Sequence, residues 1–154
     1  MVAAAKLGTM VITELRGDLF EVGLAALAHG CNCAGSMRAG IAKEFRRRWP
    51  AMYSQYRARC RTGAFLPGDV LVWPGSPVIY NLAVQLRPGP LAMLGAIEVS
   101  VARMLELAEA DGLPAVGMPR IGCRPGGLCW DEVGPVLDDL AAASTVDLVV
   151  VEPA

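Results

Sequence analysis

The sequence predicts one α/β domain in which a central sheet lies between two layers of helices. Short apolar segments with strand patterning alternate along the chain with longer segments of helical periodicity. Residues 146–152 are apolar almost throughout, which is typical of a strand covered on both faces. With 154 residues, 54% of them hydrophobic and 19% charged, the chain is long and apolar enough for one core. We therefore expect a three-layer α/β/α domain over residues 1–154, without a linker or a repeat.

The expected elements follow from local patterns. Strand patterns, in which apolar residues alternate or run together between turn residues, occupy residues 9–15, 24–28, 69–73, 77–84, 115–119 and 146–152. Helical patterns occupy residues 40–49, 51–60, 91–110 and 131–143. In the longest of these, Leu94, Ile97, Val101 and Met104 recur at the spacing of one helix face. Asp131 is the expected N-cap of the last helix.

The cysteines and the histidine do not predict a metal or redox site. The chain has five cysteines, Cys31, Cys33, Cys60, Cys123 and Cys129, an odd number without disulfide-type spacing. The single histidine, His29, is too little for a zinc site, so we expect no metal and no cofactor. His29 and Cys31 would share one strand face, but nothing in the sequence orients the imidazole for a catalytic dyad. We therefore favour a core or loop histidine and small buried thiols.

No targeting or membrane segment is indicated either. The longest apolar runs are much shorter than the roughly 18 to 20 residues that span a bilayer. The N-terminal residues lack the pattern of a signal peptide. The expected location is therefore cytoplasmic, without membrane contact.

Charge is balanced overall at −1 but is unevenly distributed. Residues 1–63 hold ten Lys and Arg against four Asp and Glu, and residues 64–154 hold four against eleven. The most basic segment runs from Arg46 to Arg61, with Trp49, Tyr53 and Tyr56 among its arginines. Arginines beside aromatic rings suit phosphates and stacked bases, so this segment is a candidate nucleic-acid contact. A solvated helix face with anchoring aromatic residues is the alternative, and we favour it.

Two glycine-rich loops, residues 30–40 and 120–127, each follow a strand and precede a helix. In this order, backbone N–H groups can face an anion without a Cβ in the way. Two such loops at one end of a sheet would form a cleft able to hold a diphosphate from both sides. Neither loop contains the Gly-Lys-Ser/Thr of a P-loop or a GxGxxG, so the sequence supports neither an NTPase nor a Rossmann dehydrogenase.

A family resemblance emerges from GDLF (residues 17–20), NCAGSMRAGIAKEFRRRWP (32–50), GDVLVW (68–73), VIYNLAVQ (78–85) and MPRIGCRPGGLCW (118–130). Together these segments resemble the macrodomain family of ADP-ribose binders. Within that family the chain looks like the terminal ADP-ribose glycohydrolases, which act on modified glutamate and aspartate. It is also similar to the macrodomain of a bacterial antitoxin that reverses ADP-ribosylation of DNA thymidine. The resemblance covers about residues 10–150 and implies a mixed central sheet.

The resemblance also implies roles for individual residues. Asp18 would accept a hydrogen bond from the adenine amino group, although a turn role would explain it equally well. Asn32 would face the hydroxyls of the distal ribose, with Cys33 as a small packing neighbour. The backbone of both glycine loops would bind the diphosphate. The substrate-binding residues implied are Asp18, Leu19, Cys31, Gly35, Met37, Gly40, Ile41, Val84, Pro119, Arg120, Ile121, Gly122, Cys123, Arg124, Gly126 and Gly127.

The expected catalytic residues depart from the resembled branch. In the glutamate-specific members, a lysine after the strand matching residues 77–84 and an aspartate in the second glycine loop take part in the reaction. Gln85 and Gly126 stand at those positions here, so a Schiff-base route through such a pair is not open. We expect a positioned water to attack the distal ribose, with a substrate phosphate oxygen accepting its proton. Gln85 and Asn32 are the expected catalytic residues, as orienting groups.

The resemblance thus implies a mono-ADP-ribosyl hydrolase of modified acidic side chains or thymidine bases. A reader that only binds ADP-ribose and an O-acetyl-ADP-ribose deacetylase are the alternatives. The expected partners are ADP-ribose and ADP-ribosylated protein or DNA, and we expect a monomer.

Overall fold

The computed structural model describes residues 11–154, which form a six-stranded sheet in the order β1-β6-β5-β2-β4-β3. The strands are β1 (Thr13–Arg16), β2 (Ala26–Asn32), β3 (Val70–Trp73), β4 (Val78–Gln85), β5 (Ala115–Met118) and β6 (Asp147–Glu152). Neighbouring strands are parallel except β3 with β4, which are antiparallel. The sheet is mixed, as the resemblance implied.

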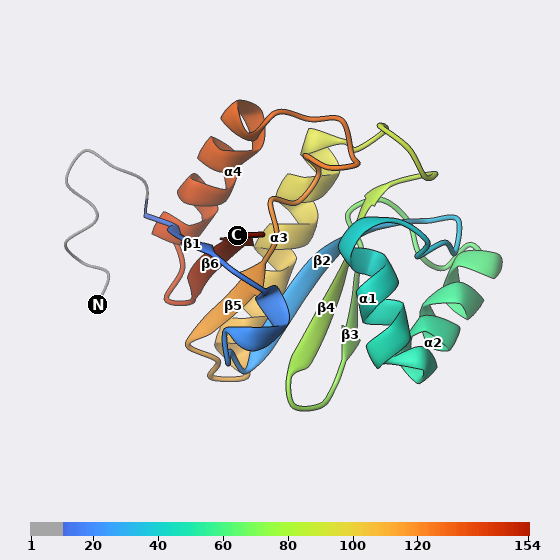
Figure 1. Ribbon diagram of the computed structural model, residues 1–154, viewed down its shortest axis with the longest axis horizontal. Helices are drawn as coiled ribbons and strands as arrows, with labels where there is room; N and C mark the ends of the chain where they lie inside the picture. Colours follow the sequence, from blue (N-terminus) through green and yellow to red (C-terminus); the bar gives the residue numbers. More distant parts are fainter. Residues whose placement is uncertain (1–10) are drawn as a thin grey trace.

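Helices cover both faces of this sheet (Figure 1). On one face lie α1 (Gly40–Arg48) and α2 (Pro50–Arg61), which contribute Phe45, Met52 and Tyr56 to the buried cluster there. On the other face lie α3 (Leu94–Ala110) and α4 (Trp130–Ala142), with a separate buried cluster that includes Ile97 and Leu137. A short 3-10 helix, η2 (Leu19–Glu21), follows β1. The predicted three-layer α/β/α fold is confirmed.

The structure corrects the expected end of the second strand. The sequence placed Gly30, Cys31 and Asn32 in a loop, but β2 continues through Asn32 and pairs with β4 over that length. Pairing with β4 keeps these residues in the strand, because it satisfies their backbone groups on that side. Gly30 fits a tight position, since a Cβ there would lie 3.0 Å from side-chain atoms of both Val84 and Ile121, which would have to shift. The first glycine loop therefore begins at Cys33.

Several other boundaries differ from expectation by a few residues, three of them for reasons that the structure shows. β1 begins at Thr13, whereas residues 9 and 10 of the predicted strand lie outside the described residues. α3 begins at Leu94 rather than at residue 91, because the Met93 N–H donates to the carbonyl oxygen of Val84 and the chain before it is still extended. The N-cap of α4 is Cys129, not Asp131, and the Glu132 carboxylate accepts from the Cys129 backbone N–H at 3.0 Å. A glutamate at the N3 position is the expected partner in a capping box.

None of the helices in residues 11–154 combines the length and the apolarity that crossing a bilayer requires.

Candidate functional site

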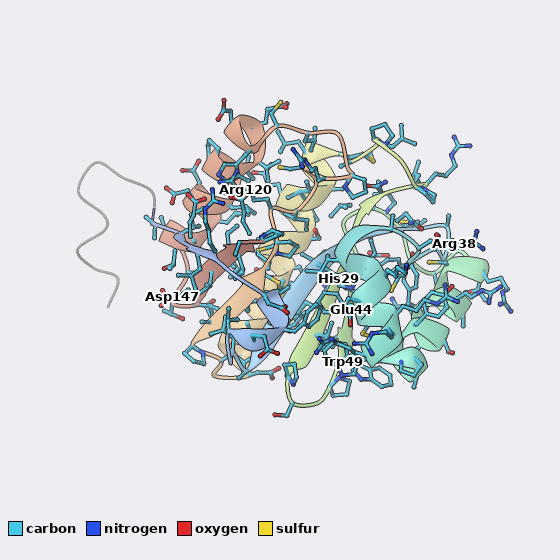
Figure 2. All side chains as sticks on the ribbon, in the orientation of Figure 1. His29, Arg38, Glu44, Trp49, Arg120 and Asp147 are labelled. Atoms are coloured by element: carbon cyan, nitrogen blue, oxygen red, sulfur yellow. The ribbon has the colours of Figure 1, made fainter. Side chains whose placement is uncertain are left out.

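A cleft of about 1320 Å³ lies beyond the carboxyl ends of β4, β5 and β6. One wall is the side of α1, and the other is the loop that leads from β5 to α4. The turn after β1 and the last residues of the chain close one end, and Gln85 lies at the end of β4. Figure 2 labels Glu44 on α1 and Arg120 on the far side, beside α4. The cleft therefore occupies the place where open α/β folds bind ligands.

Backbone N–H groups without partners lie on both sides of the cleft. α1 begins at Gly40 with no side-chain cap and no acidic residue in its first turn, so the N–H groups of that turn are free. Across the cleft, the N–H groups of Gly122, Arg124 and Gly126 donate to no backbone carbonyl within residues 11–154. The two sides are close, since a Cβ on Gly40 would lie 3.6 Å from Pro125 Cδ. This arrangement suits an anion that spans the cleft.

The second glycine loop is folded too tightly to accept side chains. A Cβ on Gly126 would lie 2.8 Å from the Cα of Gly122 and closer still to its carbonyl oxygen. Gly122 itself has φ +78°, in the left-handed region, and a Cβ there would lie 2.6 Å from the Ile97 Cδ1 atom. The Leu128 N–H donates to the Gly122 carbonyl at 3.0 Å and closes the loop. Both glycines are therefore needed for the loop to hold its N–H groups in place.

Asp18 lies at the end of the cleft nearest β1. It caps η2, and its Oδ1 accepts from the Phe20 backbone N–H at 2.9 Å. The turn role considered from the sequence is thus present. The second carboxylate oxygen accepts no hydrogen bond within the described residues, so it remains free for a donor in the cleft.

A charged group on α1 lines the cleft near this end. The Glu44 carboxylate accepts from Arg47 and, at 3.0 Å, from Arg48 Nε, and these hydrogen bonds lower the pKa of Glu44, that from Arg47 most. The Arg48 guanidinium lies 4.3 Å from the centre of the Phe20 ring. Glu44, Arg47 and Arg48 were not predicted as cleft residues, although Glu44 and Arg47 follow the predicted Gly40 at helical spacing on one side of α1.

Arg120 is fixed on the opposite wall. Its Nη2 lies 3.1 Å from Glu14 Oε1, and its Nε lies 3.2 Å from Glu152 Oε2. Its guanidinium also lies 4.8 Å from the ring centre of Trp130. Because two carboxylates already neutralise Arg120, it contributes shape to the cleft more than free positive charge.

Gln85 is the expected catalytic residue that reaches the cleft. Its side chain is 8% exposed, and its Nε2 donates to the carbonyl oxygens of Arg87 at 2.7 Å and Gly89 at 2.8 Å. Both amide hydrogens are thereby used. The Oε1 atom accepts no hydrogen bond within the described residues, so Gln85 can act in the cleft only as an acceptor.

Asn32 lies beneath the first glycine loop instead of on the cleft wall. Its Oδ1 accepts from the Ala34 N–H at 2.9 Å, and its Nδ2 donates to the Ser36 carbonyl at 2.8 Å. The Tyr56 hydroxyl lies 2.7 Å from the Asn32 carbonyl oxygen and 2.9 Å from Oδ1. Burial raises the pKa of Tyr56, so this hydroxyl stays protonated and donates. The Asn32 amide thus holds the loop in shape.

The cleft wall brings together most of the predicted site residues: Asp18, Leu19, Gly40, Ile41, Val84, Gln85, Pro119, Arg120, Ile121, Gly122, Cys123, Arg124 and Gly126. Five predicted residues do not line it: Cys31, Asn32, Gly35, Met37 and Gly127. Cys31 and Met37 are buried in the core on the side of α1 and α2. Gly35 has φ +84°, in the left-handed region that favours glycine, and a Cβ on Gly127 would lie 2.8 Å from the Pro90 Cβ, so both glycines serve the conformation of the loops.

His29 is a core residue. Its Nε2 lies 2.7 Å from Asn81 Oδ1, and its ring stacks on Phe45 with centroids 3.9 Å apart. Burial lowers the pKa of His29 to about 4, and the hydrogen bond with Asn81 offsets only part of that effect. Burial also raises the pKa of Cys31, which lies beside it. A neutral thiol and a neutral imidazole away from the cleft do not form a catalytic dyad, so the predicted core histidine and buried thiol are confirmed for His29 and Cys31. The prediction of buried thiols is wrong for the other cysteines, because Cys33, Cys60 and Cys123 are partly exposed and Cys129 is exposed.

The aromatic residues of the basic segment face inward. Tyr56 is buried beneath Asn32, and the Trp49 ring packs against Phe20 and Phe45. The Tyr53 hydroxyl donates to the Gly35 carbonyl at 3.1 Å. The expectation that rings of this segment stack on bases is therefore wrong for Tyr56, because the ring is wholly covered. Anchoring aromatic residues under a solvated face describe the segment better.

The family model of the Macro domain matches residues 28–137 of the chain. The chain belongs to this family. As a macrodomain it is 29% identical over 128 residues to a DNA ADP-ribosyl glycohydrolase of Mycobacterium tuberculosis, a match that covers 80% of the chain. It is 47% identical over 57 residues, or 36% of the chain, to an ADP-ribose 1''-phosphate phosphatase of Aspergillus oryzae. The macrodomain of Mycobacterium tuberculosis DarG superposes with a TM-score of 0.83 at 29% identity, over 93% of this chain and 98% of that one. The family inferred from the sequence is confirmed.

The macrodomain corresponds to only part of its curated relatives. The matches cover 36% of the Mycobacterium tuberculosis glycohydrolase and 28% of the Aspergillus oryzae phosphatase, so the chain spans about a third of the length of the curated relatives it matches.

Proposed function

We propose that the cleft binds ADP-ribose and that the protein removes mono-ADP-ribose from modified thymidine bases of DNA or from modified acidic side chains. The observation that carries this proposal is the pair of facing sets of free N–H groups, at the start of α1 and in the loop of Gly122 and Gly126. A diphosphate is an anion of suitable length to accept hydrogen bonds from both sides. The named activities of the relatives, which all concern ADP-ribose compounds, support the same ligand.

The orientation of the ligand follows from what lies at each end. Asp18 offers a free carboxylate oxygen at the end near β1, which suits the amino group of adenine. Gln85 lies at the end of β4, near the start of α1, and would flank the distal ribose. With the adenosine at Asp18 and the distal ribose at Gln85, the diphosphate lies between the two sets of N–H groups.

The chemistry proposed is hydrolysis by one water molecule. The Gln85 Oε1 accepts a hydrogen bond from that water and aims its oxygen at the anomeric carbon of the distal ribose. The new carbon–oxygen bond forms as the bond to the target breaks, and the target leaves with the bonding electron pair. A substrate phosphate oxygen takes the proton of the water. The protein contributes position and N–H dipoles, which can supply large rate factors without a protein base.

Two other functions use the same cleft. A reader would bind ADP-ribose without release, and the absence of a side chain at Gly126 makes that outcome chemically reasonable. A deacetylase of O-acetyl-ADP-ribose would direct water at an ester carbonyl instead of the anomeric carbon. We favour hydrolysis over reading, because Gln85 lines the cleft and its amide oxygen accepts no hydrogen bond within the described residues.

The test is release of ADP-ribose from two substrates side by side, a thymidine-modified single-stranded DNA and a glutamate-modified protein, with calorimetry of ADP-ribose binding on the same preparation. We expect binding and release from at least one substrate, which names the linkage. Binding with no release from either would make the protein a reader, and an absence of binding would refute the ligand itself.

A further inference from the structure

We propose that three loops around the Gln85 end of the cleft form a binding surface for a single-stranded polynucleotide. The loops, here called the loop rim, are residues 33–39, 86–93 and 119–129. The inference rests on the proposed function, because the strand is inferred to be the carrier of the ADP-ribose held in the cleft. It also moves the expected nucleic-acid contact away from the segment between Arg46 and Arg61.

The loop rim is one continuous surface. The Cys33 N–H donates to the Leu86 carbonyl oxygen at 3.2 Å, which joins the first loop to the second. The Ala92 N–H donates to the Gly126 carbonyl oxygen at 3.0 Å, which joins the second to the third. Figure 1 shows the segments before α1 and before α3 at the same end of the sheet. Gln85 is tied to the middle loop through its amide nitrogen, so the rim surrounds the proposed reaction end.

The charge of the loop rim has one sign. The three loops contain Arg38, Arg87, Arg120 and Arg124 and no aspartate or glutamate. Arg120 is paired with two carboxylates, but Arg38, Arg87 and Arg124 are exposed and form no ion pair within residues 11–154. Figure 2 shows Arg38 at the outer edge of the molecule. On a chain of net charge −1, three unpaired guanidinium groups on these joined loops fit a partner with repeated phosphates.

Exposed apolar residues accompany these cations. Of the six large hydrophobic residues exposed within the described chain, three lie in the middle loop: Leu86 at 52%, Leu91 at 51% and Met93 at 43% exposure. An acidic peptide would satisfy the arginines but would leave this apolar surface in water. A single strand offers phosphates for the arginines and flat base faces for the leucines. By contrast, Arg47 and Arg48 lie at the opposite end of α1 from Gly40 and are paired with Glu44.

The experiment uses a fluorescent, unmodified oligodeoxythymidine of twelve residues and fluorescence anisotropy at 50 and 200 mM salt. The test variant is R38Q/R87Q/R124Q. The control variant is R57Q/R61Q/R103Q, which removes the same charge from exposed arginines of α2 and α3 that also lack ion pairs within the described residues. The logarithm of the binding constant falls linearly with the logarithm of the salt concentration, and each lost phosphate contact to a single strand should make this slope shallower by about 0.7. For three lost contacts, the loss of affinity over this fourfold salt range therefore differs roughly 20-fold between the two proteins.

We expect wild type to lose about 20-fold more affinity than the test variant between the two salt concentrations, and the control to behave as wild type. The proposal is overturned if wild type does not bind the oligonucleotide, if the control loses as much as the test variant, or if a glutamate-rich peptide binds the rim equally well. Calorimetry with free ADP-ribose separates the two claims. Normal ADP-ribose affinity in wild type and in the control variant, together with any of these outcomes, leaves the proposed function standing and removes the loop rim.

Discussion

Replacing Gly126 by alanine tests the anion-binding loop most sharply. The new Cβ would lie 2.8 Å from the Gly122 Cα and closer still to its carbonyl oxygen. These are backbone atoms that no rotamer change can move, so the loop must open. Opening displaces the N–H groups of residues 122, 124 and 126 from the cleft. Hydrogen bonds to a charged group contribute about 1.5–3 kcal/mol each, so the loss of only two of these three weakens ADP-ribose binding by about 3–6 kcal/mol. That corresponds to a loss of affinity of at least a hundredfold.

The assay is calorimetry with ADP-ribose, with thermal unfolding as a check that the variant is folded. Gly95→Ala is the matched control, because Gly95 lies in α3 with no atom within 4 Å of the added Cβ. We expect the control to bind as wild type and to be slightly more stable, since alanine favours a helix. A folded Gly126→Ala protein that binds ADP-ribose within threefold of wild type would refute the role given to the loop.

Three further predictions follow from the same geometry. Gln85→Ala should lower turnover at least tenfold while ADP-ribose affinity stays within threefold, because the lost acceptor serves only the reacting water; a parallel fall in both constants, measured by product release and calorimetry, would show a binding role instead. Asn32→Ala should also lower turnover more than the affinity for ADP-ribose, because it loosens the turn of residues 33–36. Tyr56→Phe loosens the same turn and should have a smaller effect in the same direction. Equal loss of turnover and of ADP-ribose affinity for Asn32→Ala would contradict this. Because the pKa of His29 falls from 6.5 in the unfolded chain to about 4 in the folded one, its contribution to stability is complete above pH 6.5 and declines as the pH falls toward 4. This term lowers the free energy of unfolding by about 2 kcal/mol between pH 7 and pH 5, and urea unfolding that shows no decline over that range would refute the neutral buried imidazole.

The sequence predicted what depends on local periodicity and on glycine. Each expected strand and helix exists, because apolar spacing is imposed by the faces that each element buries. Thirteen of the eighteen predicted site residues line the cleft. The two glycine loops were predicted from their strand, loop and helix order, and the individual residues were implied by the family resemblance. The fold and the two glycine loops thus follow from patterns within single segments.

Contacts between segments could not be predicted in the same way. Asn32 was assigned to the ligand, but its amide is used by Ala34 and Ser36, and only the folded chain shows that Tyr56 reaches it from α2. Gly30 was taken as a loop residue, although it is a strand residue that makes room for Ile121. Each of these depends on which distant segment packs alongside, and periodicity carries no information on that.

The central claim is that water attacks the anomeric carbon of ADP-ribose conjugates in this cleft. The most direct measurement is mass spectrometry of the products formed in ¹⁸O-labelled water from a glutamate-modified peptide and from a thymidine-modified oligonucleotide. We expect ADP-ribose to be released with the label in its distal ribose and the target to be released unlabelled. Label in the glutamate carboxylate would show attack on the ester carbonyl instead, and intact substrates in the presence of tight ADP-ribose binding would show that the macrodomain only reads the modification.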